Sequence, residues 1–253
     1  MIRLHNVSKW FGNQLILSEI SLEIPADTCV CLIGRSGSGK SLLARIILGL
    51  EYPDTGSVQV HGSLLHPLAM SDTTSLYQDT GVVFQANALF DSLTVRENIG
   101  LRLDESNVSP VEAEHLVRTS LQKVGLDPSI LSQLPAQLSG GMQKRVGIAR
   151  AIVHTPSLLI YDEPTSGLDP MNADRIDRLI AAIQQRPGQT SLVITHDLDS
   201  VRMLADSIVL LDRGRIHFVG TWTTFLSSQD PIVKAFRRRQ DAQKKPPPGG
   251  GSI

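Results

Sequence analysis

The feature that most constrains the fold is the stretch GRSGSGKS, residues 34–41, which places three glycines and three serines between two ordered elements. The preceding TCVCLI, 28–33, reads as a buried strand, and the following LLARIILGL, 42–50, reads as a helix. Glycines let backbone N–H groups converge on an anion without Cβ clashes. A helix that begins directly after such a loop offers its positive N-terminal end to the same anion. The stretch therefore predicts an anion site at a strand–loop–helix junction.

The spacing of Gly34, Gly39, Lys40 and Ser41 fits G-x-x-x-x-G-K-[ST], the phosphate-binding loop. The lysine of this pattern supplies a charge for the β- and γ-phosphates of a nucleotide, and the hydroxyl can ligate Mg²⁺. A flexible Gly/Ser turn is the alternative, and the strand and helix on either side argue against it. The residues expected to contact the nucleotide are Gly34, Arg35, Ser36, Gly37, Ser38, Gly39, Lys40, Ser41 and Leu42.

Short runs rich in Val, Ile and Leu alternate with helical patterns along the rest of the chain. The runs are GVVF (81–84), SLLIYD (157–162), SLVIT (191–195) and SIVLL (207–211). Such runs suit strands that are covered on both faces. Because strands alternate with helices, we expect an α/β fold with a mostly parallel core sheet.

Two segments depart from this alternation. MIRLHNVS, ILSEISLEI and SVQVHG alternate polar and apolar residues, which predicts an N-terminal antiparallel β-subdomain. The segment from about 86 to 155 looks mainly helical, so we expect an inserted helical subdomain. Residues 1–236 should form one folded unit. Residues 237–253, RRRQDAQKKPPPGGGSI, lack apolar periodicity and predict a disordered basic tail, solvated or in contact with anionic lipid or a partner.

Composition limits the class of partner. The formal net charge is −1, so no global field points to nucleic acid. No apolar run approaches the ~20 residues of a membrane span. Cys29 and Cys31 fall on one face of a strand, where a bridge would be strained and further metal ligands are lacking, so we expect small core residues in a reducing compartment. These features predict a cytosolic protein and leave open whether it docks on a membrane protein.

A second chemical feature follows one of the apolar runs. SLLIYDE ends in Asp162 and Glu163, and a strand delivers its last side chains to the carboxyl edge of the sheet, where such ligands bind. We expect Asp162 to hold Mg²⁺ through water and Glu163 to polarise an attacking water. Two solvated acids at a strand end are the plain alternative.

The string LSGGMQKR, 138–145, resembles the LSGGQ signature of ATP-binding cassette (ABC) proteins. Ser139, Gly140 and Gly141 would open a helix and form a second anion site. The remaining motifs occur in the order of that family, and the resemblance covers about residues 1–235. They are Gln85 in VVFQ (Q-loop), Asp169 in SGLDP (D-loop), His196 in VITHD (switch histidine) and Phe11 before Gly12 (adenine stacking, with Trp10 as its rival).

The resemblance implies an ATPase that works as a head-to-tail homodimer. Each subunit's signature would close on ATP held by the other subunit's phosphate loop, with Mg²⁺ at Ser41, Gln85 and Asp162. Glu163, His196, Gln85 and Lys40 would be the catalytic residues, and His196 would hydrogen-bond the γ-phosphate. A membrane permease would sense the cycle through residues 86–100, which would hold the protein at the cytoplasmic face of the inner membrane.

Finer similarities point to one group of ABC systems. QLSGGMQKRVGIARAI, FQANALFDSLTVRENI, LDPMNADRIDRLI and DPIVKAF are similar to segments of Mce/Mla-type lipid transport ATPases. That resemblance implies an Mce-type lipid-binding protein and a STAS-domain subunit as further partners. An amino-acid-type importer ATPase and a non-transport, division-type ABC ATPase remain open. Two-cassette translation factors and coiled-coil DNA-repair relatives fit less well, because the chain has one cassette and no sustained heptads.

Overall fold

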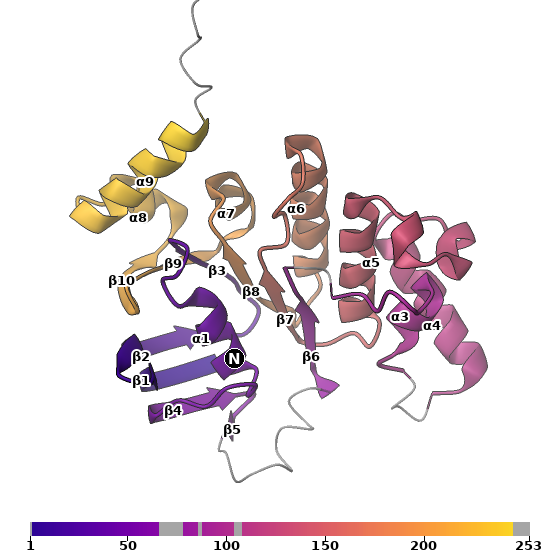
Figure 1. The fold of residues 1–253 in the computed structure, drawn as a ribbon, viewed down its shortest axis with the longest axis horizontal. Helices are drawn as coiled ribbons and strands as arrows, with labels where there is room; N and C mark the ends of the chain where they lie inside the picture. The colour runs from indigo at the N-terminus through magenta and orange to yellow at the C-terminus, as the bar shows by residue number, and fades with distance from the viewer. Residues whose placement is uncertain (1, 66–77, 86–87, 104–107, 245–253) are drawn as a thin grey trace, which may run out of the picture.

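The computed structural model describes residues 2–65, 78–85, 88–103 and 108–244, with side chains described as far as Arg239. Two sheets form the body of the molecule, and helices cover them (Figure 1). Within the described ranges, no helix is long and apolar enough to cross a membrane.

The larger sheet has six strands in the order β10-β9-β3-β8-β7-β6. These are β3 (Cys29–Gly34), β6 (Thr80–Val83), β7 (Leu158–Asp162), β8 (Thr190–Thr195), β9 (Ser207–Asp212) and β10 (Arg215–Gly220). All neighbours run parallel except β10, which pairs antiparallel with β9. The predicted α/β class with a mostly parallel core sheet is confirmed. β10 was not predicted, because its side chains are mostly half-buried and it carries no continuous apolar run.

The central strands are covered on both faces, as their apolar runs predicted. Every residue of β3 and β8 is buried. Cys29 and Cys31 belong to one apolar core and Val30 and Leu32 to the other, so the strand period of two separates the faces. Both cysteines are free thiols, as expected for small core residues.

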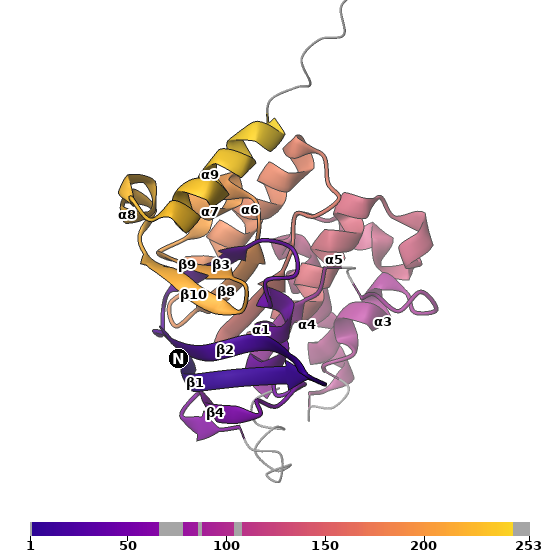
Figure 2. The same cartoon turned by 60° about the vertical axis from the view of Figure 1, so that its left-hand side comes forward.

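The smaller sheet is antiparallel and has the order β2-β1-β4-β5. Its strands are β1 (Ile2–Phe11), β2 (Gln14–Ile24), β4 (Thr55–Val60) and β5 (Ser63–Leu64). Helix α1 (Lys40–Ile47) lies between the two sheets, where its apolar face joins the second core (Figure 2). Burying each leucine or isoleucine there contributes about 2 kcal/mol, so this packing fixes the loop that precedes α1.

The chain between β6 and β7 forms a group of helices, within the predicted helical segment 86–155, that lies beside the β6 edge of the large sheet (Figure 1). They are α3 (Val95–Gly100), α4 (Pro110–Lys123), the short 3-10 helices η1 (Pro128–Ser132) and η2 (Pro135–Gln137), and α5 (Gly140–Ile152). Side chains at their N-termini set their starts. Thr94 and Glu97 form a capping box on α3, Ser109 caps α4, and Ser139 caps α5.

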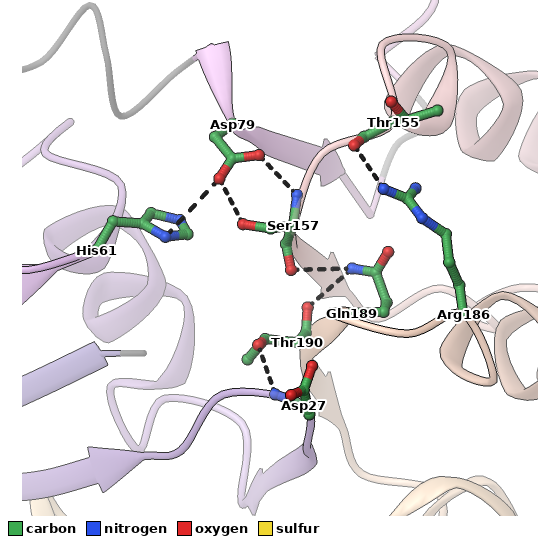
Figure 3. Close-up of polar contacts among 8 residues, drawn as sticks. All are labelled: Asp27, His61, Asp79, Thr155, Ser157, Arg186, Gln189 and Thr190. Atoms are coloured by element: carbon green, nitrogen blue, oxygen red, sulfur yellow. Dashed lines mark hydrogen bonds and ion pairs between the residues drawn. The ribbon is translucent and has the colours of Figure 1, made fainter.

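Polar contacts tie the strands together at the amino edge of the large sheet (Figure 3). The Asp79 carboxylate accepts hydrogen bonds from the Ser157 amide at 2.8 Å and hydroxyl at 2.5 Å, which links the starts of β6 and β7. The Gln189 amide donates to the Ser157 carbonyl at 3.2 Å, and Thr190 accepts from the Asp27 amide at 3.1 Å. The hydrogen bonds at this edge join strands to one another and serve the fold. The carboxyl edge, at the other end of the strands, is where we expect a functional site.

The C-terminal part adds α6 (Pro170–Gln184), α7 (Leu198–Leu204), α8 (Trp222–Ser227) and α9 (Pro231–Lys244). Helix α9 corrects the predicted tail, because residues 237–244 are helical rather than disordered. Val233 and Phe236 bury one side of α9 against the core, and the Arg, Gln, Ala and Lys residues that follow are good helix formers. The remaining predicted tail, 245–253, lies outside the described residues.

Candidate functional site

The carboxyl ends of the parallel strands open into a cavity of about 590 Å³. It brings together the phosphate loop after β3, the residue after β7 and the residue after β8. Its lining residues are Ile16, Gly34, Arg35, Ser36, Gly37, Gly39, Lys40, Ser41, Leu42, Gln85, Glu163, His196, Phe236 and Arg239. Eleven of these fourteen are residues that the sequence singled out, and they come from four separate stretches of chain.

At two positions of the loop, neighbouring atoms lie so close that only glycine fits. A Cβ on Gly34 would lie 2.1 Å from the Leu211 carbonyl oxygen, and one on Gly39 would lie 2.6 Å from Leu17 Cδ2. Gly39 also has a φ of +102°, a conformation that L side chains rarely adopt. Ser38 is buried beneath the loop and does not line the cavity. The loop is therefore packed tightly on its inner side and open on its outer side.

Lys40 curls back over the loop that precedes it. Its Nζ donates to the carbonyl oxygens of Gly34 at 2.9 Å and Arg35 at 3.0 Å. Burial lowers the pKa of Lys40, and the charges of Glu163 and Asp162 raise it in part. The ammonium group is thus held at the centre of the loop, where a phosphate oxygen could replace a carbonyl as its acceptor.

Glu163 and His196 meet across the ends of β7 and β8. His196 Nδ1 lies 2.8 Å from Glu163 Oε2, and the Glu163 amide donates to the Ile194 carbonyl at 2.9 Å. Glu163 has a φ of +49°, a strained conformation that this tertiary pairing maintains. The hydrogen bond with Glu163 raises the pKa of His196 above its ordinary value of 6.5. A carboxylate and an imidazole therefore sit side by side at the cavity wall.

Asp162 precedes Glu163 in the chain and does not line the cavity. Burial raises its carboxyl pKa, and a hydrogen bond from the Ser41 hydroxyl lowers it. Its Oδ1 is buried and has no hydrogen-bond partner among the residues that the structure describes. A buried, unpartnered carboxylate oxygen beside a hydroxyl is the donor set that a divalent cation with phosphate ligands would use, so these residues fit Mg²⁺.

Gln85 lines the cavity from the end of the β6 segment. The Nζ of Lys144, which is 4% exposed, donates to the Gln85 carbonyl at 2.6 Å. Burial lowers the pKa of Lys144, and Glu163 raises it in part. Lys144 belongs to α5, so this bond ties the signature helix to the Gln85 loop. Sequence reasoning missed it, because a lysine in a basic string gives no sign of burial.

The signature residues lie elsewhere in the same chain. Ser139 caps α5 by accepting from the Met142 amide at 3.3 Å, and Gly140 and Gly141 form the first turn. Asp169 caps α6 by accepting from the Asn172 amide at 3.0 Å, which lowers the Asp169 pKa. A Cβ on Gly141 would lie 3.5 Å from Asn172 Oδ1, so the two helix starts adjoin. Within the described residues, none of the signature residues lines the cavity.

A family model for ABC transporters matches residues 17–166 of the chain, from within β2 to the turn after Glu163. The chain belongs to the ABC transporter family. ABC ATPases hydrolyse ATP, and this cavity contains the phosphate loop, Glu163 and His196.

Curated relatives agree with this ABC assignment. The methionine import ATP-binding protein MetN of Brucella abortus (strain 2308) is 37% identical over 236 residues, 93% of this chain. The chain spans 64% of that MetN protein, so it matches part of a longer relative. The protein TRIGALACTOSYLDIACYLGLYCEROL 3, chloroplastic, of Arabidopsis thaliana is also 37% identical, over 93% of this chain and 73% of its own length.

A solved structure agrees as well. It is a dimeric ATP-binding cassette in a post-hydrolysis state with ADP and phosphate bound, 31% identical to this chain. The TM-score is 0.80, over 87% of this chain and 98% of that one. The predicted ABC ATPase fold is thus confirmed. The comparisons do not show the Mce/Mla type, an Mce partner or a STAS partner.

The aromatic residues expected against adenine do not line the cavity of this ABC cassette. Phe11 is 53% exposed, with the Lys9 ammonium 5.6 Å from its ring centroid. The Trp10 amide donates to Asp54 at 2.6 Å. Adenine stacking on Phe11 or Trp10 therefore stays a prediction.

Three lining residues were not foreseen as part of the site. Ile16 lies near the start of β2, whereas Phe236 and Arg239 come from α9. No local sequence pattern indicates them, because each reaches the cavity through the packing of distant segments. Arg239 had been assigned to a disordered tail.

Proposed function

We propose that the chain is the ATP-hydrolysing subunit of an ABC transporter, which binds MgATP between two head-to-tail copies and drives a membrane permease. The observation that carries this proposal is the division of the site. The phosphate loop, Glu163 and His196 share one cavity, whereas the Ser139–Gly141 helix start lies off it. A second copy would have to supply that helix start to complete the site.

The geometry supports a role for each residue of the cavity. The amides of residues 34–41 and the Lys40 ammonium would bind the β- and γ-phosphates. Glu163 would take the proton of the attacking water, and Gln85 would hold that water in place. His196 uses Nδ1 for Glu163, which leaves Nε2 for the γ-phosphate. Catalysis would rest on positioning and charge, because phosphoryl transfer requires little covalent chemistry from the protein.

Mg²⁺ would be held by Ser41 and Asp162, with Gln85 nearby. The described residues contain no cluster of three or more His, Cys, Asp or Glu side chains that could hold a metal alone. A Mg²⁺ ion bound with a nucleotide takes most of its ligands from phosphates and water. When bound, the ion would neutralise charge on the phosphates.

The permease would dock on an apolar cavity of about 490 Å³ at the foot of the helical segment. Phe84 and Phe90 line it and are 40% and 55% exposed. Burial lowers the pKa of His154 in its wall to about 4, so that imidazole is neutral at physiological pH. Apart from Arg102 and Arg150, the lining is mostly apolar or aromatic, which suits a short, mainly apolar helix of a membrane protein. Docking there would hold this chain at the membrane.

For the transported substrate, the relatives favour the importer alternative over the lipid reading. The MetN relative is named for methionine import, so we propose a small polar solute such as an amino acid as the first candidate. Lipid transport is the second candidate. A relative of equal identity is named after a glycolipid, and the string around Met142 resembles lipid-system ATPases.

The test is to isolate the chain with its native membrane partners and identify them by mass spectrometry. The complex is then reconstituted in lipid discs, and ATPase stimulation by methionine and by phospholipid-loaded binding protein is compared. A permease with a solute-binding protein, and stimulation by solute, is expected for the first candidate. Partners with an Mce domain would support the second, and absence of any permease would contradict both.

A groove variant provides the internal control for this test. Phe90→Ser should lose the permease while ATP binding persists, because Phe90 lies outside the nucleotide cavity. Val219→Ser is the matched control, since Val219 is equally exposed at 56% and lies on β10 away from the groove. Equal permease recovery by both variants would remove the groove from the proposed docking role.

A further inference from the structure

A further cavity of about 490 Å³, distinct from the proposed permease groove, adjoins the nucleotide cavity. It lies between the β9–β10 hairpin and α9, which are neighbours in both Figure 1 and Figure 2. Four arginines and a histidine line it, namely Arg35, Arg213, Arg215, Arg239 and His217. In a chain with a formal net charge of −1, this concentration of guanidinium groups is local.

The positive charge of this basic cavity is poorly balanced. Among the described residues that line it, Asp212 is the only acidic one, and it is 9% exposed. Across the described residues, no ion pair joins any of the four arginines to a carboxylate. Like charges that converge on one cavity repel each other, and a bound anion would relieve that repulsion.

The rest of the lining is apolar. Leu210, Ile232, Ala235 and Phe236 form the wall between the arginines and the core. The volume lies within the range of about 300–1,000 Å³ that is usual for small-ligand pockets. Guanidinium groups bind phosphate oxygens in bidentate fashion, so a small phosphorylated molecule fits this lining better than a flat protein surface does.

A hydrogen bond links the β9–β10 turn, which borders the basic cavity, to the phosphate loop. The Gly214 amide, in the β9–β10 turn, donates to the Ser38 carbonyl at 3.2 Å. A Cβ on Gly214 would lie 2.1 Å from the Ile16 carbonyl oxygen, so the turn has no room to shift inward. Arg35, Phe236 and Arg239 line both cavities. A ligand in one cavity would therefore act on the walls of the other.

We propose that the basic cavity binds a small anion with phosphoryl groups, and that its occupancy is coupled to nucleotide binding. This site is separate from the γ-phosphate site of the ATPase cycle. The coupling is reciprocal, because two ligands that share Arg35 and Arg239 must change each other's affinity by the same factor.

Calorimetry with tripolyphosphate tests the site in the full-length chain. ADP is kept saturating, to fill the phosphate loop, and Mg²⁺ is kept in excess over all phosphates. One tripolyphosphate should bind each chain. In Arg213→Gln/Arg215→Gln the affinity should fall at least about 10-fold, because each guanidinium–phosphate bond is charge-assisted. Both arginines are exposed, so the variant should fold.

Arg178→Gln/Arg202→Gln is the matched control, with the same change in net charge on exposed arginines away from the cavity. It should bind tripolyphosphate as the wild type does. No binding in saturating ADP, or equal weakening in both double variants, would overturn the proposal.

A second readout tests the coupling alone. ADP affinity is measured with and without tripolyphosphate, and the ratio of the two affinities is the coupling factor. This coupling factor should equal the ratio of the tripolyphosphate affinities measured with and without ADP. The factor should fall to one in Arg213→Gln/Arg215→Gln while ADP affinity without tripolyphosphate is unchanged. A wild-type factor of one would contradict the coupling.

Discussion

Replacing Glu163 with glutamine isolates the chemical step, because the amide keeps the size of the side chain. The backbone contact that positions residue 163, from its amide to the Ile194 carbonyl, does not involve the carboxylate. Glutamine can also take the place of the carboxylate 2.8 Å from His196 Nδ1. The variant therefore loses the negative charge and the ability to accept a proton, and little else.

A positioned general base contributes about 10²–10⁴-fold to a rate. The Glu163→Gln variant should thus hydrolyse ATP about 10²–10⁴-fold more slowly, which corresponds to about 3–5 kcal/mol of activation free energy. ATP binding should stay within about threefold of wild type, because the phosphate loop and Lys40 are untouched. A dimer that closes on ATP but cannot hydrolyse it should persist and be visible by light scattering.

The assay is single-turnover release of phosphate at saturating MgATP, with nucleotide binding measured in parallel. Glu23→Gln is the matched control, because Glu23 is exposed and pairs only with Arg3 on the small sheet. A Glu163→Gln rate within tenfold of wild type would refute the role of Glu163 as base. If the variant also lost ATP binding to the same extent, Glu163 would contribute to binding of ATP before reaction rather than to the chemical step.

Three further variants test the site and the fold. Lys40→Ala should lower ATP hydrolysis at least about 10²-fold, because it removes the charge that faces the transferred phosphate; steady-state rates equal to wild type would exclude this. Gly39→Ala should weaken nucleotide binding by about 1–3 kcal/mol, because its Cβ would meet Leu17; Gly37→Ala, with nothing within 4 Å, should cost less, and calorimetry compares the two. Burial raises the pKa of Asp177 to about 6, so the folded state binds its proton more tightly than the unfolded state and stability falls as pH rises from about 4 to 6. Asp177→Asn removes this cost of about 3 kcal/mol, and urea unfolding should show a larger gain in free energy of unfolding at pH 7.5 than at pH 4.5; equal gains would contradict it.

Local chemistry explains why most of the site was predictable. The phosphate loop, Asp162–Glu163 and His196 each follow a buried apolar strand, so their position at the carboxyl edge depends on short-range pattern. In the structure the phosphate loop, Glu163 and His196 line one cavity, and Asp162 adjoins Glu163 outside that lining. Parallel strands of one sheet present their ends together, which makes this kind of site readable from sequence.

The residues that were missed depend on long-range packing. Lys144 reaches Gln85 across 59 positions, and Ile16, Phe236 and Arg239 join the cavity from the two ends of the chain. Polar composition suggested disorder after Phe236, yet the buried side of α9 anchors a helix that continues to Lys244. Composition alone does not reveal such an anchor.

The central claim is that ATP is shared between two copies of this chain. The most direct measurement is a crystal structure of the Glu163→Gln variant with MgATP. We expect a twofold dimer in which the Ser139 hydroxyl lies about 2.5–3.0 Å from a γ-phosphate oxygen held by the other copy's phosphate loop. A nucleotide-bound single copy with Ser139 facing solvent would contradict the account.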